Sequence, residues 1–317
     1  MKNFATSNET LHATVVRGLT SSDKYIPTTW VFDTRGGDLY EHAITVPEYY
    51  LSVAETRLLT VSVAGIADAT RARTLIDLGC GAASKCRPLL EQLHSRGLLT
   101  CYVAWDINED AVAQSVEFVS AAFPAVAIES IVEDFHESAR PLSFGNPQLA
   151  ISLGCTFGNL SPGERHALFS SLCRRLGASG SLLIGADLLK NTDKLLGAYD
   201  GTAPSDLWKN ALVRANAELD ADFDLDNFVY HKQWNAAARQ VDHYLRATTS
   251  HKVSLRRMGA TIGFARNELI KVAHSAKMSA LEWTQELETA SYTVQRWWID
   301  DRDTYGLCLA QAQPFRG

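Results

Sequence analysis

The middle of the chain alternates short apolar runs with longer stretches whose apolar residues recur every three or four positions. The short runs have the length of buried strands, and the longer stretches have the period of amphipathic helices. This alternation is typical of βαβ units around a parallel sheet. The predicted strands are residues 74–78, 100–105, 126–132, 148–153 and 181–185, and the predicted helices are 83–96, 109–122 and 162–176.

The pattern changes after Asp187. A helical stretch comes first, and three segments of alternating polar and apolar residues follow it, as in antiparallel strands. A last helix then precedes a predicted hairpin, which suits the antiparallel edge of a sheet. The predicted helices are 191–219 and 279–288, and the predicted strands are 228–234, 240–248, 252–255, 293–299 and 304–310, the last two joined by a turn at 300–303.

The two patterns predict an α/β fold made of two parts. Residues 54–189 and 280–317 form the parallel core, and residues 1–53 and 190–279 form a second, split lobe. Open α/β sheets bind ligands at the carboxyl ends of their strands. A lobe that covers those ends can exclude water from a reaction.

Composition and charge exclude several classes of protein. Hydrophobic residues make up 46% and charged residues 21% of the chain, as in folded globular proteins. The net charge of -6, without a long basic run, gives no general attraction to nucleic acid or anionic membranes. The N-terminal stretch MKNFATSNETLHATVV lacks the apolar core of a secretion signal, so we expect a cytoplasmic protein. The dispersed cysteines include no CxxC pair and no histidine at zinc spacing, so we predict no metal site.

The first predicted strand runs into a glycine-bearing loop, DLGCGAASK. Gly79 and Gly81 let the backbone approach a ligand closely where a helix begins. The loop lacks the third glycine of the dinucleotide fingerprint GxGxxG, and an acidic residue before the first glycine is typical of sites for S-adenosylmethionine. We expect Lys85, in the same loop, to face that cofactor.

Two further strand ends carry side chains that suit a nucleoside. Asp106 ends the second strand, where its carboxylate can accept hydrogen bonds from both ribose hydroxyls. Asp134 and Phe135 follow the third strand and provide a carboxylate for the adenine amine and an aromatic face for its ring. Three such positions at successive strand ends predict one S-adenosylmethionine site.

Four stretches of the sequence resemble the ergothioneine-pathway histidine Nα-methyltransferases: WVFDTRGGDLYEHAITVPEYYLSVAETRLL, IDLGCGAASK, LGCTFGNLSPGER and ELDADFD. The likeness covers nearly the whole chain. It implies a Rossmann-like class I methyltransferase sheet with a second, split lobe that binds the substrate amino acid. Gly79, Lys85, Asp106, Asp134 and Phe135 match the family's S-adenosylmethionine-binding positions.

The same resemblance implies a set of substrate-binding residues. Asn159, Tyr49 and Tyr199 match positions that hold and orient the carboxylate and amine of the amino acid, and we expect them to carry catalysis. Tyr40 in DLY and Gly154 in LGCTFGN match further positions around the same groups.

Two departures from the family pattern bear on the substrate. Phe32 in WVFD replaces a tyrosine whose hydroxyl is expected near the amine. Ala273 stands where the histidine enzymes have an imidazole-binding glutamate, while Ser275 matches their serine and His243 falls near a pocket methionine. Loss of the carboxylate removes the charge-assisted hydrogen bond that selects imidazole. We therefore predict S-adenosylmethionine-dependent N-methylation of a free amino acid other than histidine.

Two other functions remain open on the sequence. The missing hydroxyl at Phe32 fits methylation of a side-chain nitrogen, such as the guanidino group of arginine or an indole nitrogen, instead of the α-amine. A noncatalytic S-adenosylmethionine-binding protein is an alternative from another class. The set of Tyr49, Asn159 and Tyr199 argues against that second alternative.

Overall fold

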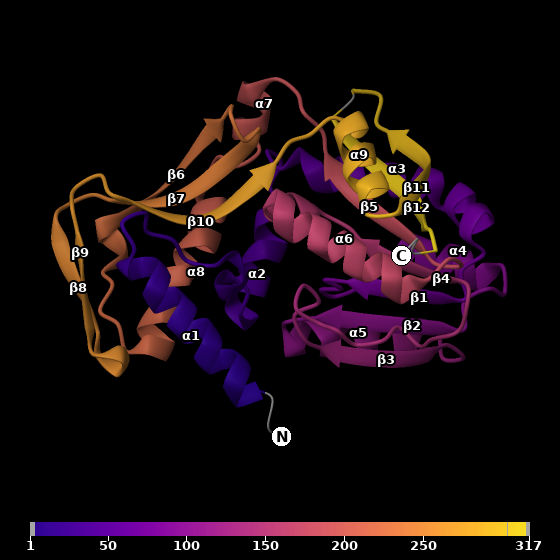
Figure 1. Cartoon of the computed structure of the whole chain (residues 1–317), viewed down its shortest axis with the longest axis horizontal. Coiled ribbons are helices and arrows are strands. Elements are labelled where there is room, and N and C mark those ends of the chain that lie inside the picture. Colours follow the sequence, from indigo (N-terminus) through magenta and orange to yellow (C-terminus); the bar gives the residue numbers. More distant parts are fainter. Residues whose placement is uncertain (1–3, 303, 315–317) are drawn as a thin grey trace. The chain divides into compact units, whose positions relative to one another are not determined.

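The computed structural model describes residues 4–302 and 304–314, so Asp303 of the predicted turn lies outside the described residues, as do both ends of the predicted domain ranges. The chain divides into two compact units (Figure 1). Unit 1 comprises the described residues up to Tyr49 together with Thr192–Ser275, and unit 2 comprises Tyr50–Asn191 together with the described residues from Ala276 onward. In the part of the chain that is described, no helix is long and apolar enough to cross a membrane.

Unit 2 is built on a seven-stranded sheet with the order β11-β12-β5-β4-β1-β2-β3. The strands β1 to β5 run parallel, and β12 lies antiparallel between β5 and β11. This is the class I methyltransferase arrangement that the sequence predicts. The strands are β1 (Thr74–Leu78), β2 (Cys101–Asp106), β3 (Ala127–Val132), β4 (Gln148–Ser152), β5 (Ser181–Asp187), β11 (Tyr292–Ile299) and β12 (Tyr305–Ala312).

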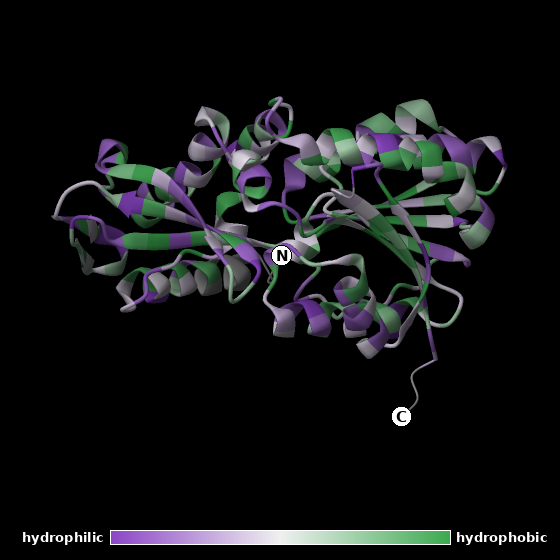
Figure 2. Cartoon of the chain, turned by 90° about the horizontal axis from the view of Figure 1, so that it is seen from above, coloured by the Kyte–Doolittle hydropathy of each residue, from purple (hydrophilic) through white to green (hydrophobic). Residues whose placement is uncertain are grey.

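Helices lie on both faces of this sheet, whose strands are largely hydrophobic (Figure 2). The strands β1, β4 and β5 are buried at every residue. Burial on both faces explains why these strands read as continuous apolar runs rather than as alternating patterns. The helices of unit 2 are α3 (Tyr50–Thr70), α4 (Arg87–Ser95), α5 (Glu109–Ala122), α6 (Pro162–Leu176) and α9 (Ala280–Thr289), with a short 3-10 helix η2 (Thr156–Asn159).

Local sequence signals fix where these helices begin. The Asn108 side chain accepts hydrogen bonds from the first turn of α5, and Ser161 with Glu164 forms a capping box on α6. The helix predicted from residue 83 begins only at Arg87. Ala83 has a φ of 57°, which an α-helix cannot contain, so the residues before Arg87 form turns instead.

Unit 1 contains two small sheets, a three-stranded one with the order β10-β7-β6 and a two-stranded one of β8 and β9. Its strands are β6 (Phe228–Asn235), β7 (Gln240–Ala247), β8 (His251–Leu255), β9 (Ala260–Phe264) and β10 (Leu269–Ala276). Its helices are α1 (Phe4–Thr20), α2 (Thr34–Ala43), α7 (Thr192–Gly197) and α8 (Thr202–Leu219), with short 3-10 helices η1 (Thr28–Val31), η3 (Leu225–Asn227) and η4 (Arg256–Met258).

The continuous helix predicted over 191–219 is wrong, because α7 and α8 are separate. The chain breaks at Tyr199 to Gly201, where Gly201 has a φ of 97° that only glycine adopts readily. Strands β9 and β10 are absent from the sequence predictions. In β10 the neighbours Val272 and Ala273 are both buried, so the strand lacks the simple alternation that reveals a half-buried strand.

The core of unit 1 joins its two chain segments. Leu19 and Trp30 from the first segment pack with Ala211 and Leu212 from α8. The Trp30 Nε1 donates a hydrogen bond to the carbonyl of Ala211 at 2.9 Å. Asn210 Nδ2 donates to the carbonyl of Val31, also at 2.9 Å. The two segments of unit 1 therefore share one interior.

Candidate functional site

The glycine loop after β1 is fastened to the end of β2. Gly79 and Gly81 have φ values of 76° and 50°, in the left-handed region that favours glycine. The Gly79 N–H donates to the carbonyl of Trp105 at 2.8 Å, and the Gly81 N–H donates to Asp106 Oδ2 at 3.1 Å. The first two predicted cofactor positions therefore lie side by side.

Asp106 is held by two backbone N–H groups. Its Oδ2 accepts from Gly81, and its Oδ1 accepts from the Asn108 N–H at 3.0 Å. A carboxylate oxygen can accept two hydrogen bonds, so each oxygen keeps one acceptor site for a ribose hydroxyl. Burial raises the pKa of Asp106 above its ordinary value, although the N–H groups of Asn108 and Gly81 oppose that shift.

Phe135 connects the third predicted position to the glycine loop. A Cβ built on Gly79 would lie 4.0 Å from Cε1 of the Phe135 ring. An aromatic ring therefore lies beside the glycine backbone, at the place where the sequence predicts a nucleoside base. Asp134, the preceding residue, has its Oδ1 hydrogen-bonded to the backbone N–H and to Nδ1 of His136, at 2.9 and 2.7 Å. Burial alone would raise the pKa of Asp134, but His136 holds it below its ordinary value.

Asp77 is the acidic residue that precedes the glycines in DLGCG, and its side chain lies in the interior beside Tyr102. It is buried, and its Oδ2 accepts from the Tyr102 hydroxyl at 3.0 Å. That hydroxyl also lies 2.8 Å from the Ser115 Oγ. Burial raises the pKa of Asp77 to about 6, against hydrogen bonds from Cys86 and Tyr102 that favour the charged form.

Gly154 and Asn159 lie on the loop after β4, which distant parts of unit 2 hold. The Gly154 N–H donates to Oε1 of Glu55 in α3, and the Gly154 carbonyl accepts from the Tyr305 hydroxyl at 2.9 Å. Glu55 also accepts a hydrogen bond from Tyr305. Gly154 has a φ of 88°, so a glycine suits this bend.

The loop after β4 continues into the 3-10 helix η2, and Asn159 is the last residue of η2. Arg165 from α6 donates to the carbonyls of Phe157 and Leu160, at 3.3 and 2.9 Å. The Arg165 guanidinium is buried and forms an ion pair with Glu286 of α9. Sequence patterns indicated none of Glu55, Tyr305 and Arg165, because their partners are distant along the chain.

In unit 1, Tyr199 brings three other predicted residues together. Its ring centroid lies 6.0 Å from that of Tyr49 and 4.6 Å from that of His243, edge to face in both cases. Its hydroxyl donates to the Ser275 Oγ at 3.2 Å. Tyr49, Tyr199, His243 and Ser275 therefore form one cluster.

His243 is enclosed by aromatic side chains that the sequence analysis did not select. Its ring stacks on Trp208, with centroids 5.0 Å apart, and its Nδ1 lies 2.7 Å from the Tyr230 hydroxyl. Only 1% of His243 is exposed. Tyr230 comes from β6, which pairs with the strand that carries His243.

The remaining predicted substrate residues occupy other parts of unit 1. Phe32 and Tyr40 form a second aromatic pair, edge to face at 5.8 Å, against the core. Ala273 is buried and belongs to the apolar core itself.

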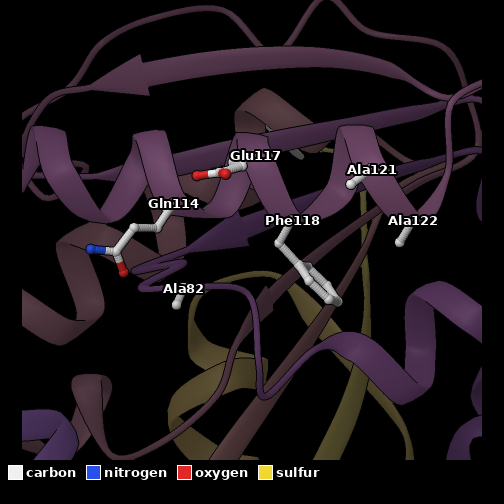
Figure 3. A pocket seen from close by; sticks show the side chains of 6 residues that line it. All are labelled: Ala82, Gln114, Glu117, Phe118, Ala121 and Ala122. Carbon is white, nitrogen blue, oxygen red and sulfur yellow. The ribbon is translucent and has the colours of Figure 1, made fainter.

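A hollow lies between Ala82 of the glycine loop and helix α5 (Figure 3). In Figure 3, Gln114 and Phe118 extend from α5 on the side of Ala82. Three of the six lining residues are alanines, and the hollow includes neither Asp106 nor Asp134. The other three lining residues, Gln114, Glu117 and Phe118, all come from α5, so the hollow is a feature of that helix and of the start of the glycine loop. Its lining residues are Ala82, Gln114, Glu117, Phe118, Ala121 and Ala122.

The comparison with known families decides the classification. A family profile described as "Histidine-specific methyltransferase, SAM-dependent" matches residues 11–312. The chain belongs to this family. The family resemblance inferred from the motifs is therefore confirmed.

Relatives with assigned activities align over different shares of the chain. Histidine N-alpha-methyltransferase of Mycobacterium tuberculosis is 33% identical over 302 residues, covering 95% of this chain and 94% of the relative. The 4-dimethylallyltryptophan N-methyltransferase easF of Claviceps fusiformis is 26% identical over 246 residues, covering 70% and 69%. Among solved structures, an S-adenosylmethionine-dependent methyltransferase from Clostridium acetobutylicum aligns with a TM-score of 0.47 and 9% identity, over 81% of this chain and 92% of that one.

Family membership makes the chain an enzyme, an S-adenosylmethionine-dependent N-methyltransferase of the amino-acid type. Its cofactor is S-adenosylmethionine, as the glycine loop and the acidic strand ends predict.

Proposed function

We propose that the chain transfers a methyl group from S-adenosylmethionine to the α-amine of a free amino acid whose side chain is not imidazole. The observation that carries this proposal is Ala273, a methyl side chain in an apolar core at the position where the resembled enzymes place a carboxylate. An imidazole N–H facing that methyl would lose a charge-assisted hydrogen bond.

The aromatic cluster in unit 1 favours an aromatic side chain. Tyr199, Trp208 and Tyr230 surround His243, so this region offers ring faces and edges. Aromatic rings pack well against such groups. The relative from Claviceps fusiformis, whose name gives a tryptophan derivative, is consistent with this preference.

The proposed roles follow the two sets of residues. Gly79, Gly81, Lys85, Asp106, Asp134 and Phe135 bind S-adenosylmethionine, which supplies an electrophilic methyl group on its sulfonium. Asn159, Tyr49 and Tyr199 are the proposed catalytic residues that hold the amino acid, and the further residues proposed for substrate binding are Phe32, Tyr40, Gly154, His243, Ala273 and Ser275. The reacting amine must be neutral. Desolvation disfavours the ammonium form, and hydrogen bonds from Asn159 and the tyrosines orient the lone pair for an in-line displacement.

Competition among free amino acids tests the proposal. We expect the kcat/KM for tryptophan, tyrosine or phenylalanine to exceed that for histidine by roughly tenfold or more, because an unpaired buried N–H costs about 1–3 kcal/mol. Arginine tests the guanidino alternative. Fragment masses of the products would show whether the α-amine or a side-chain nitrogen carries the methyl. Histidine as the best substrate by tenfold would contradict the proposal.

The substitution Ala273→Glu supplies the converse prediction. The new carboxylate should raise the kcat/KM for histidine relative to that for tryptophan by roughly tenfold, because it restores a partner for the imidazole. Ala273→Gln is the matched control, since it has nearly the same size without the charge. Equal ratios in the two variants would show that residue 273 does not face the substrate side chain.

A further inference from the structure

The chain passes between the two units at three places. These crossings lie between Tyr49 and Tyr50, between Asn191 and Thr192, and between Ser275 and Ala276. Within unit 2, each crossing has a polar side chain at or within two residues of it: Tyr50, Lys190 and Lys277.

All three of these side chains converge on one carboxylate, that of Asp187 at the end of β5. The Tyr50 hydroxyl donates to Asp187 Oδ1 at 2.8 Å, and the Lys277 ammonium donates to Oδ2 at 2.6 Å. The Lys190 ammonium also donates to Oδ1. Lys190 reaches Tyr50 as well, because its Nζ lies 2.7 Å from the hydroxyl and 4.8 Å from the ring centroid.

The backbone near these crossings repeats the same connection. The Leu189 N–H donates to the carbonyl of Met278 at 3.1 Å, and Leu188 forms a parallel bridge with Met278. The segments after β5 and before α9 therefore run side by side within unit 2. Backbone contacts and the side-chain contacts of Asp187 therefore both join the second crossing, after Asn191, to the third crossing, before Ala276.

The cluster around Asp187 is buried and charged. Lys277 is 0% exposed and Asp187 is 2% exposed. Burial alone would raise the pKa of Asp187, but the charges of Lys277 and Lys190 hold it below its ordinary value. Burial lowers the pKa of Lys190 against the attraction of Asp187. A buried ion pair is often no more stabilising than a well-packed apolar pair, so stability gives a weak reason for this arrangement.

We propose that Asp187 is a positioning residue that holds the three crossings at one point of unit 2. Turnover of the amino acid requires the crossings to be held there. The inference rests on the proposed function, in which the chain methylates a free amino acid. Asp187 acts through Tyr50, Lys190 and Lys277. Because a displacement of about 1 Å can lower a rate by roughly 100-fold, loosely held crossings lower turnover even when each unit is intact.

The main test is the double variant Asp187→Asn with Lys277→Met. It removes one charge of each sign, while the Lys190 ammonium loses its carboxylate and keeps the Tyr50 hydroxyl as a partner, so we expect a folded protein with a lower melting temperature. With the parent's best amino acid, kcat/KM should fall by at least roughly tenfold, with both kcat and KM affected. The dissociation constant of S-adenosylmethionine, measured by calorimetry, should stay within about twofold, because the residues proposed to bind it all lie at other strand ends of unit 2.

A gentler variant and a matched control complete the experiment. Tyr50→Phe leaves all charges in place and detaches only the first crossing, so it decides the outcome if the double variant does not fold. We expect it to lower kcat/KM roughly three- to tenfold, since it removes two hydrogen bonds with charged groups, one to Asp187 and one from Lys190. The control is Lys24→Met with Glu268→Gln, which removes an ion pair that joins distant segments inside unit 1. It should lower the melting temperature without changing kcat or KM.

The outcomes separate this inference from the proposed function. Normal kcat and KM in the Asp187 and Tyr50 variants, or an equal loss of cofactor affinity, would overturn the positioning role whichever amino acid the parent prefers. A parent enzyme that prefers histidine would overturn the proposed substrate and leave the Asp187 comparison valid.

Discussion

Single residues in unit 2 are held in place by backbone groups. Each oxygen of Asp106 accepts one backbone N–H, and Phe135 lies against the bare backbone of Gly79. The sequence indicated these positions because strand ends and glycines are local signals. The partners of Asp134 were also near in sequence, but the role of His136 depends on a ring orientation that no pattern encodes.

Asp106→Ala should weaken the binding of S-adenosylmethionine by about 1.5–3 kcal/mol, because the ribose hydroxyls lose a charged acceptor. Calorimetry on the free enzyme measures the change. Asp110→Ala, on the exposed first turn of α5, is the control and should bind as the parent does. If Asp106→Ala binds S-adenosylmethionine as tightly as the parent does, Asp106 does not bind the ribose.

At the scale of elements, the sequence predicted regular structure best where caps mark it. Helices α5 and α6 have the predicted bounds, and Asn108 and Ser161 cap them. The break between α7 and α8 and the irregular strand β10 were missed, because Gly201 inside a helical pattern and buried neighbours in a strand both weaken the periodic signal. The substrate positions came from family motifs alone, since local sequence does not show which rings meet His243.

The loop between β4 and α6 gives a prediction about an element held from outside. Glu55→Gln keeps the shape of the side chain but weakens its hydrogen bond to the Gly154 N–H, since charged acceptors bind more strongly than neutral ones. We expect kcat to fall roughly tenfold while cofactor affinity stays within about twofold, because the loop carries Asn159.

Steady-state kinetics and calorimetry on the same preparation test the Glu55 prediction. Glu282→Gln, in the capping box of α9, serves as a control with a similar loss of one charge-assisted hydrogen bond. A parallel loss of kcat and cofactor affinity would make Glu55 a general structural residue.

At the scale of the whole molecule, one buried carboxylate should set part of the pH dependence of stability. The pKa of Asp77 is raised to about 6 in the folded protein, above the value of 3.8 expected when the chain is unfolded. The folded state therefore binds this proton more tightly. The stability that this proton provides is lost as the pH rises from about 4 through about 6, and the loss approaches about 3 kcal/mol at pH 7.

Asp77→Asn should therefore stabilise the protein at pH 7 and change its stability little near pH 4. Denaturant unfolding of the parent and the variant across this range gives the difference directly, and other titrating groups cancel in it. Curves that stay parallel at all pH values would show that the pKa of Asp77 is not raised in the folded protein.

The shared core of unit 1 has a consequence for the order of events during protein synthesis. Leu19 and Trp30 pack against α8, yet the ribosome makes residues 50–191 before it reaches that helix. At about 5–20 residues per second, this interval lasts roughly 7–30 s. During that time the N-terminal apolar side chains lack their partners, while most of the parallel sheet can already form. We expect nascent chains of intermediate length to expose this segment to chaperones, and to release it once α8 emerges.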